Sequence, residues 1–399
     1  MGLDLDPTQT LGTAMVVLFI GSFAVARVRF LRDNDIPIPV VGGILFALLT
    51  SGLFLGFDIG LGFDMELKGP LMLAFFTSIG LGADLRMLAR GGPRLLVFGV
   101  ICLTYLIVQN GVGVVTAMGL DLHPLVGLLG SSITLSGGHG TGAAYAQQFA
   151  EVENLAGAME LAMACATFGL IIGGLLGGPV AGRLIRRHRL EPRGLKDADE
   201  VDEVDEEPPI DTESLLRTLF FVVVCLTIGS TLADWMAGAP FRLPGFVWCL
   251  FVGVVIRNVG HAVPILRVHT PTVDALGSLS LSLFLAMALM SLRLWELAGL
   301  AGPLLVLMAV QTLGMMLFAS FVTWRFIGRD YDAAIIAGGH CGFGMGATPT
   351  AVANMQALTR RFGPAPQAFL VVPLMGAFFI DLLNAIVIQG FMALPVFGG

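Results

Sequence analysis

The chain has few charged residues: Asp, Glu, Lys and Arg together make up only 13% of the sequence. A soluble globular domain usually carries about 25% charged residues, so this composition excludes an ordinary soluble protein. No basic patch with interleaved aromatic residues is present, which argues against nucleic acid as a partner. The hydrophobic content of 56% indicates instead an integral protein of the lipid bilayer.

Paired cysteines are also lacking. The five cysteines are an odd number and lie in apolar segments or in a glycine-rich stretch. This pattern predicts buried free thiols and excludes a disulfide framework or a zinc site. No Lys or Arg precedes the first apolar run, at 11–26, so this run predicts a retained membrane span and not a signal peptide.

Long apolar runs dominate the rest of the sequence. A transmembrane helix needs about 17–25 predominantly apolar residues. By this measure the sequence predicts an all-α polytopic membrane protein with about ten transmembrane helices. The expected helices lie at 10–27, 38–56, 69–85, 94–118 and 157–185 in the first half, and at 214–236, 244–257, 273–292, 301–325 and 366–393 in the second.

The basic residues are distributed unevenly over the loops between these helices. If the N-terminus is outside, all of the 22 Lys and Arg residues except Lys68, Arg242 and Arg293 fall on the cytoplasmic side. This asymmetry follows the positive-inside rule. Both termini are therefore predicted to lie outside the cytoplasm.

One segment, 186–213, has a soluble composition. It begins with a basic cluster and continues with a run of Asp and Glu that ends at Pro208-Pro209. Such a composition cannot bury a core, so we predict a cytoplasmic linker. Its acidic part, 191–213, separates a first domain, 1–190, from a second domain, 214–399.

Two glycine-rich stretches, 136–142 and 338–350, interrupt the apolar pattern. They lie in apolar pieces, about 122–149 and 332–358, that are too short on either side of their glycines to cross a bilayer. Backbone released from helical hydrogen bonds must be buried in protein or line a wet cavity. We therefore predict two re-entrant hairpins that form the functional centre.

The two halves of the chain repeat one another. Similar residues recur 210 positions apart in three places. The matched pairs are Gly43 and Gly253, Gly92-Pro93 and Gly302-Pro303, and Phe168 and Phe378. Because each half holds five expected spans, an odd number, the second copy is predicted to be inverted. Two inverted five-helix repeats with interrupted segments at matching positions are typical of secondary transporters that bind substrate near the bilayer midplane.

Several motifs resemble those of the bacterial sodium/glutamate symporter family. The matching stretches are 70–76, 130–144, 162–169, 280–290, 339–350 and 372–381. The resemblance covers nearly the whole chain apart from the acidic linker. It implies sodium-coupled uptake of L-glutamate across the bacterial inner membrane by a homodimer, working by an elevator mechanism, with the termini periplasmic.

We expect substrate contacts at both glycine stretches and on two neighbouring spans. Helix N-termini and exposed N–H groups stabilise anions without a mobile cation, as the two carboxylates of glutamate require. The expected substrate-binding residues are Gln109, Asn110, Ser136, Gly137, Gly138, His139, Thr141, Gly339, His340, Gly342, Gly344, Gly346, Thr348, Asp381 and Asn384. Helix packing remains an alternative role for the glycines, interhelical hydrogen bonding for Gln109 and Asn110, and a structural role for both histidines.

Sodium, the coupling ion, is expected at hard oxygen atoms from the same region. The expected ligands are Asp381, Thr348, Thr350 and Ser136. A carboxylate deep in an apolar span costs at least about 2.5 kcal/mol, which makes Asp381 a functional candidate, although a hydrogen-bonded structural acid is the alternative.

Other functions remain open at this point. The nearest is a sodium- or proton-coupled symporter of another dicarboxylate or hydroxycarboxylate. An intramembrane enzyme is disfavoured because the sequence has no His-Glu-x-x-His motif and no Gly-x-Ser-x-Gly around Ser136. A channel is disfavoured by the inverted repeat. No organic cofactor is expected, since the 18 Met and 28 Phe residues suit a lipid-facing surface better.

Overall fold

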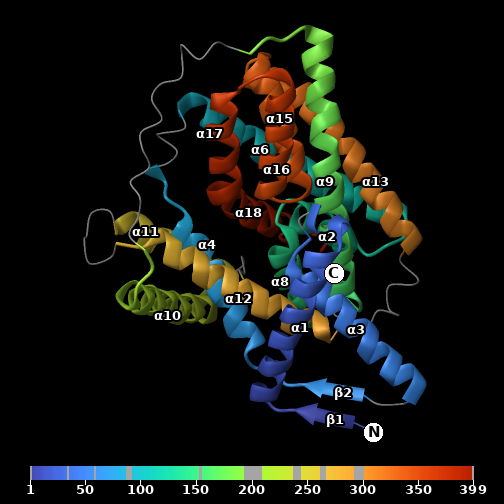
Figure 1. The fold of residues 1–399 in the computed structure, drawn as a ribbon, viewed down its shortest axis with the longest axis vertical. Helices are drawn as coiled ribbons and strands as arrows, with labels where there is room; N and C mark the ends of the chain where they lie inside the picture. Colours follow the sequence, from blue (N-terminus) through green and yellow to red (C-terminus); the bar gives the residue numbers. More distant parts are fainter. Residues whose placement is uncertain are drawn as a thin grey trace. The chain divides into compact units, whose positions relative to one another are not determined.

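The chain is almost entirely helical in the computed structural model, which describes residues 2–33, 36–57, 60–86, 92–151, 155–192, 209–236, 244–260, 267–291 and 301–397 (Figure 1). It divides into two compact units, and each draws on both halves of the sequence. Unit 1 comprises Met1–Leu31, Pro37–Leu85 and Val204–Leu294, and unit 2 comprises Arg32–Ile36, Arg86–Glu203 and Trp295–Gly399.

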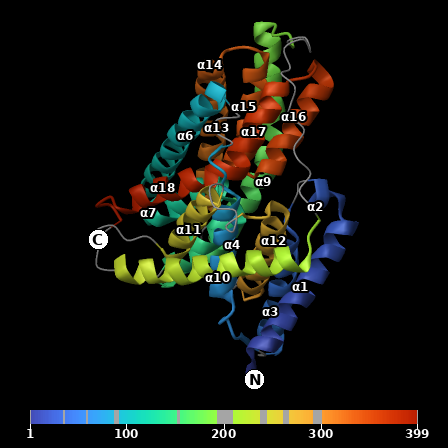
Figure 2. The ribbon, with the colours of Figure 1, turned by 90° about the vertical axis from the view of Figure 1, so that its left-hand side faces the viewer.

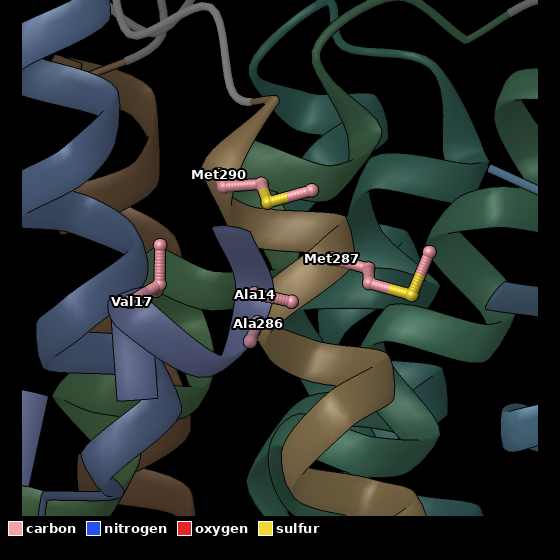
Figure 3. Close-up of a cluster of buried hydrophobic side chains, with 5 residues drawn as sticks. All are labelled: Ala14, Val17, Ala286, Met287 and Met290. Atoms are coloured by element: carbon pink, nitrogen blue, oxygen red, sulfur yellow. The ribbon is translucent and has the colours of Figure 1, made fainter. Parts of the chain in front are cut away.

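Unit 1 contains the first three apolar helices of each half. Its elements are β1 (Gly2–Leu5), α1 (Pro7–Arg27), the start of α2 (Arg29–Asp33), α3 (Ile38–Phe57), β2 (Gly60–Phe63), α4 (Lys68–Gly82), α10 (Thr212–Trp235), α11 (Gly245–Val259) and α12 (Thr270–Met290). Helix α4 packs against both α11 and α12, and α1 packs against α3 and α12. Ala14 and Val17 of α1 meet Ala286, Met287 and Met290 of α12 in a buried cluster (Figure 3).

A short strand pair accompanies these helices. Strand β1 runs parallel to β2, with Gly2 opposite Gly60 and Leu5 opposite Phe63. Only helices were predicted from the sequence, because two strands of four residues each, with three glycines between them, carry no recognisable periodicity. Asp6 follows β1 and begins α1 by accepting a hydrogen bond from the N–H of Gln9 at 2.8 Å.

Unit 2 contains the remaining two long helices of each half and both glycine-rich stretches. Its elements are α6 (Gly92–Gly119), α7 (Pro124–Leu128), η1 (Leu129–Ile133), α8 (Gly138–Glu151), α9 (Ala158–His188), α13 (Ala301–Phe318), η6 (Ala319–Thr323), α14 (Trp324–Ile327), α15 (Tyr331–Met345), α16 (Thr348–Phe362), α17 (Pro366–Leu374), η7 (Met375–Phe379) and α18 (Ile380–Met392), where η marks a π-helical turn. Helices α15 and α16 lie beside α9, the long green helix, in both views (Figures 1 and 2).

Six helices of the described part of the chain are long and apolar enough to cross a membrane. They are Pro7–Arg27, Gly92–Gly119, Ala158–His188, Thr212–Trp235, Thr270–Met290 and Gly302–Ile327. Shorter apolar helices accompany them at Ile38–Leu53, Pro124–Ile133, Gly245–Val259 and Ile380–Met392. The prediction of a polytopic helical membrane protein is confirmed at this level.

The predicted helices at 301–325 and 366–393 are each interrupted by a π-helical turn. The second interruption, η7, follows Pro373, which has no N–H to donate within α17. Such turns insert a residue into the helical ladder and are common at functional sites. The turn η7 ends two residues before Asp381.

The predicted acidic linker lies largely outside the described residues, which resume at 209. Asp211 then begins α10 and accepts a hydrogen bond from the N–H of Ser214 at 2.8 Å. Hydrogen bonds from Ser214 hold the pKa of the Asp211 carboxyl below its usual range.

Candidate functional site

The first glycine-rich stretch joins two short helical pieces, and we call residues 124–151 hairpin 1. Its first piece, α7 with η1, breaks from helical geometry at Gly130 (ψ 18°) and Ser131 (φ −123°, ψ −130°). Gly138, with φ 68°, begins α8 in a conformation that L-residues with side chains rarely adopt. The first N–H groups of α8 consequently have no partner within the helix.

The second glycine-rich stretch lies mostly inside a helix, and we call residues 331–362 hairpin 2. Helix α15 continues through Gly338–Gly344 to Met345, and the chain breaks only at Gly346 and Ala347 before α16 begins at Thr348. The expectation of freed backbone throughout this stretch is therefore wrong. Its glycines allow close packing: a Cβ on Gly342 would lie 2.6 Å from the backbone nitrogen of Ala351 in α16.

The two glycine-rich stretches meet in unit 2. The Ser136 hydroxyl of hairpin 1 lies 3.1 Å from the Gly344 carbonyl oxygen of hairpin 2 and 2.8 Å from Gln109 Oε1. Gln109 of α6 donates through Nε2 to the same Gly344 carbonyl at 3.0 Å. Segments about two hundred residues apart in the sequence are thus joined by a buried set of hydrogen bonds among Ser136, Gln109 and Gly344.

The break in hairpin 1 is held by amide side chains. The N–H of Ser132 donates to Asn110 Oδ1 at 3.0 Å, and the Ser132 carbonyl accepts from Asn384 Nδ2 at 2.9 Å. Gln311 of α13 donates to Ser131 Oγ at 2.7 Å. A broken helix leaves backbone groups that need such partners when no water reaches them.

Both predicted histidines are buried and hydrogen-bonded to threonine. His139 Nε2 lies 3.1 Å from Thr167 Oγ1, and His340 Nδ1 lies 2.9 Å from Thr323 Oγ1 in η6. The His340 ring is surrounded by aromatic rings, at 5.3 Å from Phe98, 5.1 Å from Tyr105 and 5.2 Å from Phe343, centroid to centroid. These contacts anchor each hairpin to a neighbouring long helix.

The remaining predicted residues lie at the second break and on α18. A Cβ on Gly376 of η7 would lie 2.6 Å from Thr348 Oγ1, so the start of α16 adjoins the π-helical turn. The Thr350 hydroxyl is buried, and the described residues offer it no hydrogen-bond partner. Asp381 is half-buried, and no hydrogen bond to its carboxylate is found among the described residues. Thr141 lies buried in the first turn of α8.

Sequence reasoning missed Gln311, Ser131 and Ser132 as members of this polar region. Gln311 is a buried amide in the apolar helix α13, and its polarity inside a predicted span was a usable signal. Ser131 and Ser132 give no such signal, because only the break at Gly130 and Ser131 brings their backbone groups into the site. No group of three or more His, Cys, Asp or Glu side chains suited to a metal ion occurs among the described residues.

A glycine seam fixes hairpin 2 against α9. A Cβ on Gly173 would lie 2.9 Å from the Gly342 carbonyl oxygen, and one on Gly177 would lie 2.5 Å from the Gly338 carbonyl oxygen. Asn354 of α16 reinforces the seam by donating to the Gly173 carbonyl at 2.8 Å. The position of hairpin 2 therefore depends on close backbone contact with α9.

This seam predicts different effects for two adjacent glycines. Gly177→Ala is expected to destabilise the protein by about 1–3 kcal/mol, because the added methyl group overpacks the seam. Gly178→Ala is the matched control, since nothing lies within 4 Å of its Cβ position. Alanine favours the helix equally at both positions, so thermal melting of the two purified variants isolates the seam. Equal melting temperatures for the two would contradict this packing role.

Comparison with known proteins identifies the family. A sequence model of the family described as sodium/glutamate symporter matches residues 3–364. The sodium/glutamate symporter of Escherichia coli (strain K12) is 50% identical over 401 residues, covering 99% of each chain. That of Haemophilus influenzae is 49% identical over 397 residues, covering 98% of each chain. The resemblance inferred from the motifs is confirmed, and the chain belongs to the sodium/glutamate symporter family.

Proposed function

We propose that this protein is a secondary active transporter that couples sodium entry to the uptake of L-glutamate. The observation that carries the proposal is the contact of Ser136 and Gln109 with the Gly344 carbonyl, which joins the two glycine-rich stretches. The relatives named sodium/glutamate symporters match nearly the full length of the chain. As a member of this family the chain is a carrier and not an enzyme; sodium is its coupling ion, and no organic cofactor is required.

Substrate contact is proposed at the two breaks. The first turn of α8, from Gly138 to Thr141, presents N–H groups that suit a carboxylate. Ser136, Gly137 and His139 surround this turn, and Gly344, Gly346 and Thr348 surround the break before α16. Gln109, Asn110, Asp381 and Asn384 complete the proposed substrate set.

Three predicted residues receive a different role within this proposal. Gly339, His340 and Gly342 lie inside α15, where helical hydrogen bonding occupies their N–H groups. We assign them the positioning of hairpin 2, through the glycine contacts and the His340–Thr323 hydrogen bond. For sodium we retain Asp381, Thr348, Thr350 and Ser136 as proposed ligands.

We further propose two inverted repeats, each with a re-entrant hairpin. Supporting this, both halves have the same order of elements: three apolar helices in unit 1, then a long helix, a helical hairpin and a last long helix in unit 2. With the basic residues on the inside, both termini face the periplasm of a bacterial inner membrane, and 186–213 is cytoplasmic.

The division into units also supports an elevator mechanism. Unit 2 contains both hairpins and all proposed substrate and sodium residues, whereas unit 1 contains none of them. We propose that unit 2 carries the substrate while unit 1 provides the scaffold and the contact of a homodimer. An anion moving through a low-dielectric region needs an accompanying cation and fixed dipoles, which explains the coupling.

Uptake of labelled L-glutamate into proteoliposomes tests the function. An inward sodium gradient is expected to drive accumulation, and replacing external sodium by choline is expected to abolish it. Other dicarboxylates and hydroxycarboxylates in excess serve as competitors, and a proton gradient without sodium serves as the second control. Uptake that persists without sodium, or that a different dicarboxylate drives better than glutamate, would contradict the proposal.

A further inference from the structure

Two buried oxygen atoms beside the break of hairpin 1 have no hydrogen-bond partner in the part of the chain that the structure describes. They are Ser132 Oγ and Asn384 Oδ1, and their residues are 0% and 1% exposed. Buried side-chain oxygens almost always have a partner, so two neighbouring exceptions in one site require an explanation. A bound ligand that interacts with oxygen atoms would explain both exceptions.

The two residues are joined through the backbone carbonyl of Ser132. Asn384 uses its Nδ2 group to donate to the Ser132 carbonyl at 2.9 Å, which leaves its Oδ1 free. The same carbonyl also accepts from the N–H of Gly137 at 2.9 Å. The Asn384 amide is therefore oriented by hydrogen bonding, and its unused oxygen lies near both Ser132 and the tip of hairpin 1.

The chemistry of these atoms selects a small hard cation. Hydroxyl and amide oxygens are hard ligands that suit ions such as sodium. Both atoms are buried from solvent, which disfavours an amino acid as the direct ligand. Asn110 Nδ2 is also buried without a partner, but an amide N–H group is a donor and does not bind a cation, so it is not among the ligands.

The carboxylate of Asp381 lies about one helical turn from Asn384. Asp381 lies three residues before Asn384 on α18, so the two side chains share a face of the helix. The turn η7 before Asp381 interrupts α18 at its start, and Asn384 shows that this face of the helix reaches hairpin 1. A carboxylate near two neutral oxygens compensates a monovalent cation in a low-dielectric site.

We propose that Ser132 Oγ and Asn384 Oδ1, together with the Asp381 carboxylate, hold a coupling sodium ion at the break of hairpin 1. This assignment rests on the proposed sodium-coupled function, and it adds Ser132 and reassigns Asn384 from substrate to ion. The ion lies beside the backbone that leads through Gly137 to the first turn of α8. Sodium binding therefore orders the tip that receives the carboxylate, and by linkage glutamate raises sodium affinity by the same factor.

Thermal melting of the purified full-length protein without glutamate tests the site. Sodium chloride is titrated against choline chloride at constant ionic strength, and the rise in melting temperature gives the half-effective sodium concentration. Ser132→Cys replaces a hard oxygen by a soft sulfur of similar size, and Asn384→Ala removes the second oxygen. Each is expected to raise the half-effective sodium concentration by about tenfold or more.

A matched control and a second readout separate ion binding from folding. Thr116→Ala removes a hydroxyl on α6 that, among the described residues, bonds only to Val112 of its own helix. The sodium response of this variant is expected to equal that of the wild type. Glutamate binding by Ser132→Cys at saturating sodium is expected to stay within about threefold of the wild type, since the substrate donors are intact.

The outcomes distinguish this site from the function as a whole. Wild-type sodium affinity in either folded variant would overturn the assignment while leaving sodium-coupled transport in place. If Ser132→Cys fails to give monodisperse protein, Asn384→Ala decides the question by the same measurement. Absence of any sodium response in the wild type, together with sodium-independent uptake, would instead refute the proposed function.

Discussion

Replacing Asp381 by Asn is expected to raise the sodium concentration needed for half-maximal glutamate uptake by at least about tenfold. A carboxylate interaction with a charged group contributes about 1.5–3 kcal/mol, and every 1.4 kcal/mol is a factor of ten in affinity. The half-buried Asp381 carboxylate has no hydrogen bond among the described residues, so the substitution leaves no known partner unsatisfied. Initial uptake rates in proteoliposomes as a function of sodium measure the effect.

Glu151→Gln provides the control for the loss of one negative charge. Glu151 ends α8 at an exposed position and accepts a hydrogen bond from Gln147 at 2.9 Å. The sodium dependence of glutamate uptake by the Glu151→Gln variant is expected to match that of the wild type. An Asp381→Asn protein with wild-type sodium dependence and glutamate affinity would remove Asp381 from the ion site.

Replacing Gln109 by Leu is expected to weaken glutamate binding by about tenfold to a hundredfold. The change removes two buried hydrogen bonds, one accepted from Ser136 and one donated to the Gly344 carbonyl, each worth about 0.5–1.5 kcal/mol, and leaves only the direct contact of Ser136 with that carbonyl. The two glycine-rich stretches lose a shared hydrogen-bond partner, so the two sides of the proposed substrate site are held together less firmly. Equilibrium binding of labelled glutamate at saturating sodium measures this loss.

Thr104→Val is the matched control on the same helix. Thr104 is exposed on α6, and within the described parts of the chain its hydroxyl donates only to the Val100 carbonyl of its own helix, at 2.8 Å. Its glutamate affinity is expected to be unchanged. Equal affinities for the two variants would show that Gln109 acts only as packing between helices.

The helices were predictable because their composition is constrained by the membrane. Long apolar runs such as 94–118 and 157–185 correspond to α6 (Gly92–Gly119) and α9 (Ala158–His188) with ends shifted by a few residues. The interruptions η6 and η7 were not predicted, because a π-helical turn alters hydrogen bonding without altering the apolar pattern. The same holds for the strand pair of β1 and β2.

The candidate site was predictable in its location and only partly in its structure. The glycine-rich stretches marked the two hairpins, but glycine serves both to break a helix and to pack one closely. Gly138 breaks the helix at the start of α8, whereas Gly342 allows close packing inside α15. The residues next to them in the sequence do not distinguish the two roles. The role of Ser132 depends on Asn110 and Asn384, which lie far from it in sequence and adjoin it only after folding.

A structure of the protein with sodium and L-glutamate bound tests the central claim most directly. We predict glutamate between the first turn of α8 and the break before α16, with a carboxylate near the N–H groups of Gly138–Gly140. Sodium is predicted beside Ser132 and Asn384. Glutamate bound away from both glycine-rich stretches would contradict the account.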